Sequence, residues 1–200
     1  MAYKENSVDE FDGWLFDVST YADGITLWVK KEETREVVQI QHNFSPEFFA
    51  VPKNNIGKDL QELKQILISH PNIQEVRICQ KYVNLEDHIK SDLFGVSVTK
   101  PSLFKKTIQE IDKIDLFVLY NTDLPISQMY FYVNDLFPMS FCHFKVMRDH
   151  SYCMQLVSLE LKDNNELLFY DLPPLKAIWL DVKVQQKGLK PYYNEPLEKF

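Results

Sequence analysis

The chain has 200 residues, of which 45% are hydrophobic and 14% aromatic, so it can bury the core of one large domain, or of a domain and part of another. Its net charge of −7 excludes a protein whose whole surface binds nucleic acid, although a local basic groove stays compatible with that charge. No run approaches the roughly 20 apolar residues that cross a bilayer, and the polar start has no signal-peptide region, so we expect a cytoplasmic protein without a membrane partner.

The first quarter of the chain predicts strands. Residues 13–21 and 24–31 are two strands joined by Ala22-Asp23-Gly24, which is a strong hairpin signal. Residues 36–41 alternate apolar and polar side chains and predict a third strand. A fourth strand over residues 48–51 ends at Pro52.

Two amphipathic helices are expected in the middle of the chain. The first covers residues 58–70 and is ended by Pro71, and the second begins near Pro101, a residue that suits the first turn of a helix. Each helix has an apolar stripe, formed by Leu60, Leu63 and Leu67 in the first and by Phe104, Ile108 and Ile111 in the second.

Strands at residues 73–82, 93–99 and 114–120 alternate with these helices. From residue 48 to residue 120 the order is strand, helix, strand, strand, helix, strand, which is the ferredoxin-like βαββαβ arrangement of many RNA-binding modules. It predicts an α+β fold, in which an antiparallel, β-rich domain contains a four-stranded sheet with two helices on one face. Because this topology serves many functions, it decides none of them.

A third helix and further strands are expected after the ferredoxin-like core. The helix covers residues 125–136 and is expected to bury Ile126, Met129, Tyr130 and Val133. Strand-like runs follow at residues 141–147, 154–162 and 167–170.

Residues 171–174 indicate a linker, and residues 177–184 predict one more strand. Asp181 and Lys183 lie two residues apart on this strand, so their side chains share a face. Two carboxylates in such positions can hold a pair of divalent ions for phosphodiester hydrolysis, but here a lysine puts a cation where the metals would lie. Taken from the residues alone, the pair is an ordinary ion pair at the end of a strand.

Several distinctive segments follow one another along the chain. They are the Asp23-Gly24 hairpin, the aromatic-proline strand at residues 44–51, the helix after Asp123-Leu124-Pro125, and the run Pro173-Pro174-Leu175-Lys176 before a strand that ends in Asp181-Val182-Lys183. In this order they resemble family B DNA polymerases of archaea: the last resembles the first exonuclease motif of that family, and the others resemble parts of its amino-terminal domain. The resemblance divides the chain into an amino-terminal domain over residues 1–172 and the incomplete start of an exonuclease domain over residues 173–200.

The resemblance implies a domain that flanks the template strand of DNA. Its partners would be the template and the remaining domains of the parent polymerase, which carry the nucleotidyl-transfer carboxylates and their Mg²⁺. We therefore expect no cofactor, no metal and no complete active site in this chain. Because Lys183 replaces an acid of the exonuclease motif, Asp181 is a remnant, and proofreading by the parent is expected to be crippled or absent.

Archaeal members of this family carry a pocket that captures template uracil. The positions that match its lining are Pro46, Glu47, Phe104, Leu124, Pro125, Ile126, Met129 and Tyr130. Glu47 replaces an aromatic residue and Met129 a basic one, which puts a carboxylate beside the template and removes a phosphate contact. The alternative is that these side chains are core between a helix and a sheet.

Basic residues that could contact the template are few. Lys105 and Lys106 follow the matched position Phe104 near the start of the second helix, so we expect them to contact the template backbone. Lys100, Lys145 and Arg148 are the other basic residues of interest, and a solvated surface is the alternative for all five.

Other polar groups carry no catalytic signal. Cys142, His143, His150 and Cys153 match no common zinc module, and strand geometry turns the first two to opposite faces. The acidic run Asp9-Glu10-Asp12 is expected to be a solvated tail.

Two other classes of function stay open. The βαββαβ core fits a free-standing, RRM-like nucleic-acid-binding module, although the strand around Phe94 has one aromatic residue and no flanking cation. An interaction or scaffold domain is also compatible with the net charge of −7.

Overall fold

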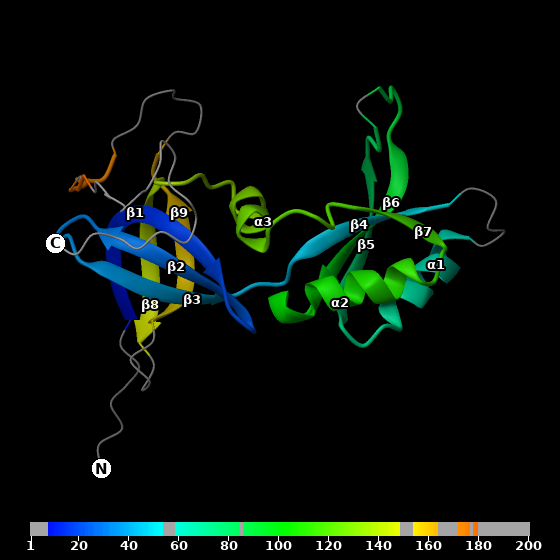
Figure 1. Ribbon diagram of the computed structural model, residues 1–200, viewed down its shortest axis with the longest axis horizontal. Helices are drawn as coiled ribbons and strands as arrows, with labels where there is room; N and C mark the ends of the chain where they lie inside the picture. The colour runs from blue at the N-terminus through cyan, green and yellow to red at the C-terminus, as the bar shows by residue number, and fades with distance from the viewer. Residues whose placement is uncertain are drawn as a thin grey trace, which may run out of the picture.

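The computed structural model describes residues 8–53, 59–84, 86–148, 154–163, 172–176 and 178–179. They form two lobes, a β-barrel and a helix-covered sheet, and a short helix lies between them (Figure 1). In the part of the chain that is described, no helix has the length and apolar character needed to cross a membrane.

Strands from both ends of the described chain close the barrel. Its order is β1 (Val8–Thr20), β2 (Gly24–Lys31), β3 (Val37–Asn43), β9 (Met154–Leu161) and β8 (Phe141–Arg148), which pairs again with β1. All neighbours are antiparallel except β3 and β9, which pair in parallel. The sequence predicts each of these strands, although it places the start of the first at residue 13, five residues after the observed start of β1 at Val8. It does not predict that the strands close into a barrel.

The barrel interior is filled by alternate residues of its strands. These side chains include the fully buried Leu15, Leu27, Ile40 and Phe144, and the ring of Phe11 stacks on that of Phe144 at 5.6 Å. Because side chains alternate between the two faces of a strand, such a barrel buries one residue in two.

The second lobe is a four-stranded antiparallel sheet of order β5-β6-β4-β7. The strands are β4 (Glu47–Pro52), β5 (Ile73–Lys81), β6 (Ser91–Val98) and β7 (Phe117–Tyr120). The expected ferredoxin-like βαββαβ order is confirmed, as is the α+β class. The hairpin of β5 and β6 extends well beyond the rest of the lobe (Figure 1).

Helices α1 (Leu60–Ile68) and α2 (Pro101–Asp112) cover one face of this sheet (Figure 1). The carboxylate of Asp59 caps α1 by accepting hydrogen bonds from two backbone N–H groups of the first turn, a favourable N-cap. The predicted apolar stripes face the sheet: the buried members are Leu63, Leu67, Phe104 and Ile111.

Helix α3 (Ile126–Val133) is shorter than the predicted helix over residues 125–136. Met129 and Tyr130 are buried as expected, whereas Val133 has 63% of its surface exposed, so that part of the prediction is wrong. Val133 is the last residue of the helix, and burial is confined to the turn before it.

The acidic run at the start of β1 is not a solvated tail, and that prediction is also wrong. The register of β1 with β8 sets Glu10 opposite Lys145 and Asp12 opposite His143. The resulting ion pairs are Glu10–Lys145 at 2.8 Å, Asp12–Lys162 at 2.6 Å and Asp9–Arg148 at 2.8 Å. Nδ1 of His143 also lies within hydrogen-bond distance of Asp12, 2.6 Å from its Oδ1. These contacts lower the pKa of Glu10 mainly through Lys145, and that of Asp12 mainly through Lys162.

Most of the predicted carboxyl-terminal elements lie outside the described residues. This holds for the strand at residues 167–170 and for Asp181 and Lys183. Of the strand expected at residues 177–184, only Ile178 and Trp179 are described; both are highly exposed and neither is in a strand.

Candidate functional site

The eight candidate pocket positions come from three segments that meet where the lobes join. Glu47 is the first residue of β4 and Pro46 precedes it. Phe104 lies in the first turns of α2, and the other five positions belong to α3 or to the residues just before it. The structure brings part of this set together and separates the rest.

The aromatic positions of this set are part of the core. Phe104 packs edge-on against Phe48 of β4 with ring centroids 6.2 Å apart. Tyr130 packs edge-on against Phe44 at 5.2 Å. Pro46 and Met129 are also buried, whereas Leu124 and Ile126 are half-buried and Pro125 is exposed. Phe104, Met129 and Tyr130 are thus buried members of the hydrophobic core, and Leu124 and Ile126 pack against it.

Tyr130 also makes a polar contact between α3 and the barrel. Its hydroxyl lies 3.0 Å from Nδ1 of His42, at the end of β3. Burial raises the pKa of the Tyr130 phenol and lowers the pKa of His42, so the phenol keeps its proton and the imidazole stays neutral. We therefore assign the phenol as donor and Nδ1 as acceptor.

Glu47 lies on the other side of the sheet from Phe104. It precedes Phe48 in β4, and Phe48 faces α2, so the side chain of Glu47 points to the opposite face, which none of the described helices covers. There its two carboxylate oxygens accept hydrogen bonds from Nη2 of Arg77 at 2.7 and 2.8 Å. Glu47 and Phe104 cannot line one pocket side by side, and the Glu47 charge is neutralised by a cation of β5.

The ion pair of Glu47 and Arg77 crosses the intervening strand β6 directly above Gly95. A Cβ atom built on Gly95 would overlap Oε1 of Glu47 and lie 3.0 Å from Nε of Arg77. Arg77 was not among the residues predicted from the sequence, although a lone glycine within a strand is a known sign of close approach by another group.

The two candidate lysines of α2 are both exposed. Lys106 lies 3.9 Å from Glu110, one turn along the helix, and Lys105 has no ion-pair partner among the described residues. Both side chains are therefore accessible to a phosphate backbone.

The amino-terminal end of α2 is occupied by the hairpin of β1 and β2. Ser102 donates from Oγ to the carbonyl of Ala22 at 2.7 Å, and Lys100 pairs with Asp23 at 2.5 Å. A carboxylate and a carbonyl already lie where a phosphate would approach the helix N-terminus. Template contact by Lys105 and Lys106 must therefore use their side chains rather than the helix dipole.

The other polar candidates are also placed by the structure. Cys142 is fully buried, which raises its pKa to about 11, while the neighbouring His143 faces Asp12 on the outside of the barrel. His150 and Cys153 lie outside the described residues. Within the described ranges, no group of three or more His, Cys, Asp or Glu residues is placed to hold a metal ion.

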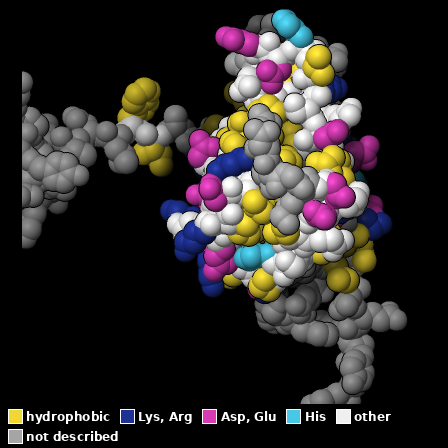
Figure 2. Space-filling model, turned by 90° about the vertical axis from the view of Figure 1, so that its right-hand side faces the viewer, with side chains coloured by type: hydrophobic (Ala, Val, Ile, Leu, Met, Phe, Trp, Pro, Cys, Tyr) yellow, Lys and Arg dark blue, Asp and Glu magenta, His cyan; other side chains and the backbone are white. Residues whose placement is uncertain are grey.

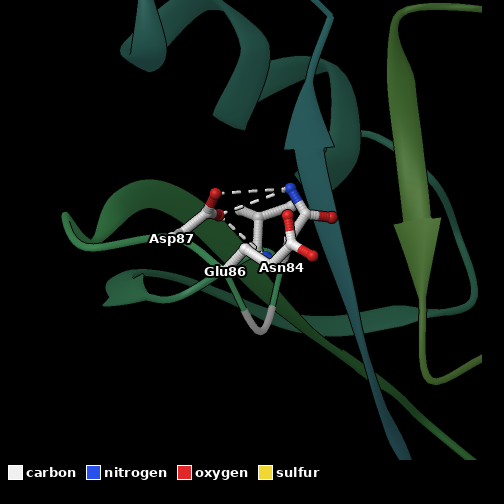
Figure 3. Close-up of a pocket in the computed structure, with 4 residues that line it drawn as sticks. Asn84, Glu86 and Asp87 are labelled. Atoms are coloured by element: carbon white, nitrogen blue, oxygen red, sulfur yellow. Dashed lines mark hydrogen bonds between the residues drawn. The ribbon is translucent and has the colours of Figure 1, made fainter.

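Charge at the free end of the ferredoxin-like lobe is mixed. Figure 2 shows Lys and Arg side chains interspersed with Asp and Glu around apolar residues, rather than gathered in one basic stripe. At the tip of the β5–β6 hairpin, a hollow of about 580 Å³ is lined by Val83, Asn84, Glu86 and Asp87. The carboxylate of Asp87 points toward the backbone N–H of Asn84 and accepts its hydrogen bond at 2.8 Å (Figure 3). The carboxylate is therefore used within the turn itself.

Comparison with known proteins gives a fold likeness but no sequence relative. No family model matches the chain, and no curated protein matches it in sequence. Among solved structures, the chain is similar to the family B DNA polymerase from the hyperthermophilic archaeon Pyrobaculum calidifontis, with a TM-score of 0.65 and 15% sequence identity. The similarity covers 93% of this chain and 24% of that polymerase chain, so the chain spans about a quarter of the polymerase's length. This likeness agrees with the family resemblance found in the sequence, and at this identity it establishes the shared fold.

Proposed function

We propose that this chain is the template-contacting, amino-terminal domain of a family B DNA polymerase that acts in the cytoplasm. The observation that carries this proposal is the fold shared with an archaeal family B polymerase over nearly the whole chain, together with the collinear motifs around Asp23, Pro46, Leu124 and Pro173.

In this proposal the chain binds and positions DNA but performs no chemistry. Nucleotidyl transfer, with Mg²⁺ held by carboxylates, belongs to the other domains of the parent, which would be the chain's protein partners. Asp181 stays as an exonuclease remnant whose acidic neighbour is replaced by Lys183.

The contact with the template is assigned to the exposed face of α2. Lys105 and Lys106 are adjacent, accessible and held on a rigid helix, so they can neutralise two phosphates without sequence preference. Glu47 points to the opposite face of the sheet and is paired with Arg77, so its charge does not oppose this contact.

Recognition of template uracil has weaker support. Phe104, Met129 and Tyr130 are buried in core contacts, so a base could enter only if these side chains moved. We expect the isolated chain to bind single-stranded DNA with and without uracil almost equally.

The test is a fluorescence-anisotropy titration of the chain with labelled single-stranded DNA at low salt. The double variant Lys105→Glu and Lys106→Glu should weaken binding at least tenfold and reduce the slope against log salt concentration by about 1.4, from 0.7 per phosphate on a single strand. The matched control, Lys64→Glu and Lys113→Glu, changes the charge equally and should cost less. Equal losses in both double variants would refute the assignment to α2.

One observation favours the RRM-like alternative. Phe49 of β4 and Tyr120 of β7 are partners in the ladder, on the sheet face away from α1 and α2. Nζ of Lys81 lies 4.7 Å from the centre of the Phe49 ring. Aromatic residues in such positions can stack on unpaired bases. If this alternative holds, Phe49→Ala with Tyr120→Ala, rather than the α2 double variant, would abolish binding to single-stranded RNA.

A further inference from the structure

Strand β7 forms one edge of the ferredoxin-like sheet, and its outer side has no strand partner among the described residues. The sheet order ends at β7, which is only four residues long and pairs with β4 alone. An edge strand presents backbone N–H and C=O groups that can pair with a further strand.

The hydrogen-bond pattern identifies the outward groups. The backbone N–H of Lys53 in β4 donates to the carbonyl of Leu116 at 3.0 Å. Because paired and unpaired positions alternate in an antiparallel ladder, Val118 and Tyr120 also direct their groups to β4. Phe117 and Leu119 therefore direct their backbone N–H and C=O groups outward. Among the described residues, these groups have no hydrogen-bond partner.

The two edges of the sheet differ in side-chain character. The opposite edge, β5, carries Glu75, Arg77 and Lys81, and charged residues on an edge discourage further pairing. Strand β7 has the sequence Phe-Val-Leu-Tyr, with no charged residue, and Val118 is 42% exposed. The β7 edge is thus the one open to pairing.

A groove runs between this edge and α2. Its volume is about 420 Å³, and its lining includes Ile108 and Asp112 of α2, Phe117 and Leu119 of β7, and Thr122. Because side chains of an added strand alternate between the two faces of the sheet, every second one would enter this groove. The lining is mixed, and its apolar part, formed by Ile108, Phe117 and Leu119, suits aliphatic side chains.

The charge of Asp112 and the short length of β7 indicate what kind of molecule would bind at this edge. The carboxylate of Asp112 has no ion-pair partner among the described residues, whereas the nearby Lys53 is held by Asp115. A second copy of this chain would pair through only the four residues of each β7. The surface area buried by such a short pairing is far less than the roughly 800 Å² per partner of a stable dimer. Both points favour a short segment of another polypeptide with a basic residue near Asp112.

We propose that the β7 edge is a docking site for an extended peptide segment of a partner protein, which adds a fifth strand to the sheet. The segment runs antiparallel to β7, places aliphatic side chains in the groove against Ile108 and Leu119, and ends with a lysine or arginine beside Asp112. This site is separate from the proposed DNA contact on Lys105 and Lys106, so either proposal can fail alone.

The test uses a fluorescein-labelled heptapeptide in which valine and threonine alternate and the last residue is lysine. It is titrated into the full chain by fluorescence anisotropy, and amide exchange is followed by NMR. In the free chain the amides of Phe117 and Leu119 should exchange faster than those of Val118 and Tyr120. Saturation with peptide should slow the exchange of the Phe117 and Leu119 amides at least tenfold.

Matched variants connect binding to the groove and the edge. Ile108→Lys and Leu119→Pro should each weaken peptide binding at least tenfold, while Gln109→Lys, with the same charge change on the exposed side of α2, should leave it unchanged. Asp112→Asn tests the end charge and should weaken binding threefold or more. Thermal unfolding of each variant identifies any that fail to fold, and a peptide N-methylated on its pairing side repeats the test on the unaltered chain.

Several results would overturn the proposal. These are absence of binding at 1 mM peptide, equal binding of the N-methylated peptide, or equal protection of all four β7 amides in the free chain. A concentration-dependent dimer that Leu119→Pro abolishes would also overturn it, because the occupant would then be a second copy.

Discussion

Replacement of Gly95 by alanine tests whether the ion pair above β6 stabilises the sheet. The new methyl group would overlap Oε1 of Glu47 and crowd Nε of Arg77, both at the ends of flexible side chains. The pair would therefore separate while the backbone stays in place. Two opposing effects follow from this change.

The magnitudes of these effects can be compared. Alanine in a strand gains about 0.5–1 kcal/mol over glycine, because it restricts the unfolded chain. The two hydrogen bonds between Glu47 and Arg77 are charge-assisted, but the Arg77 side chain is 54% exposed, so solvent screening limits their contribution to about 1–1.5 kcal/mol. Gly95→Ala should therefore be neutral or destabilising by up to about 1 kcal/mol in the otherwise unchanged chain.

The decisive comparison is the same substitution in a chain that lacks the pair. In the background Glu47→Gln with Arg77→Gln, the gain from alanine alone remains, and Gly95→Ala should stabilise by about 0.5 kcal/mol. Urea unfolding followed by tryptophan fluorescence measures both values as a thermodynamic cycle. An identical effect of Gly95→Ala in the two backgrounds would refute the reasoning.

Three further predictions concern the contacts that hold the lobes and the barrel. Tyr130→Phe removes the donor to Nδ1 of His42 and should lower the free energy of unfolding by about 1–2 kcal/mol, measured by urea unfolding at pH 8; no loss would show that the contact is not a stabilising hydrogen bond. Because its pKa is lowered in the folded state, Asp12 contributes stability above its unfolded pKa of about 3.9 that is lost as pH falls through the folded value. Asp12→Asn should thus destabilise at pH 7 and progressively less as pH falls below about 3.9, and a loss that does not change with pH would contradict the assigned ion pairs. Asp23→Ala breaks the 2.5 Å contact with Lys100 and should cost about 0.5–1 kcal/mol in thermal unfolding, with the cost falling at 1 M salt. An unchanged cost at high salt would mean that the contact is not electrostatic.

Much of the local structure follows from the sequence by itself. The apolar stripes of α1 and α2, the Asp23-Gly24 hairpin and the βαββαβ order all depend on residues close together in the chain, and the structure confirms each of them. For the same reason strand alternation correctly placed Cys142 and His143 on opposite faces of β8.

Tertiary structure decided which segments far apart in the sequence contact one another, and the candidate site depends on those contacts. The parallel pairing of β3 with β9, which closes the barrel, joins residues more than one hundred positions apart. The partners of Glu47 and Asp12, which lie 30 and 150 positions away at Arg77 and Lys162, are set by strand register. Periodicity along a chain reports which face of an element is apolar, but it does not report which other element covers that face. That choice depends on how the elements pack together, which placed Glu47 and Phe104 on opposite faces of one sheet and left β7 without a second partner among the described strands.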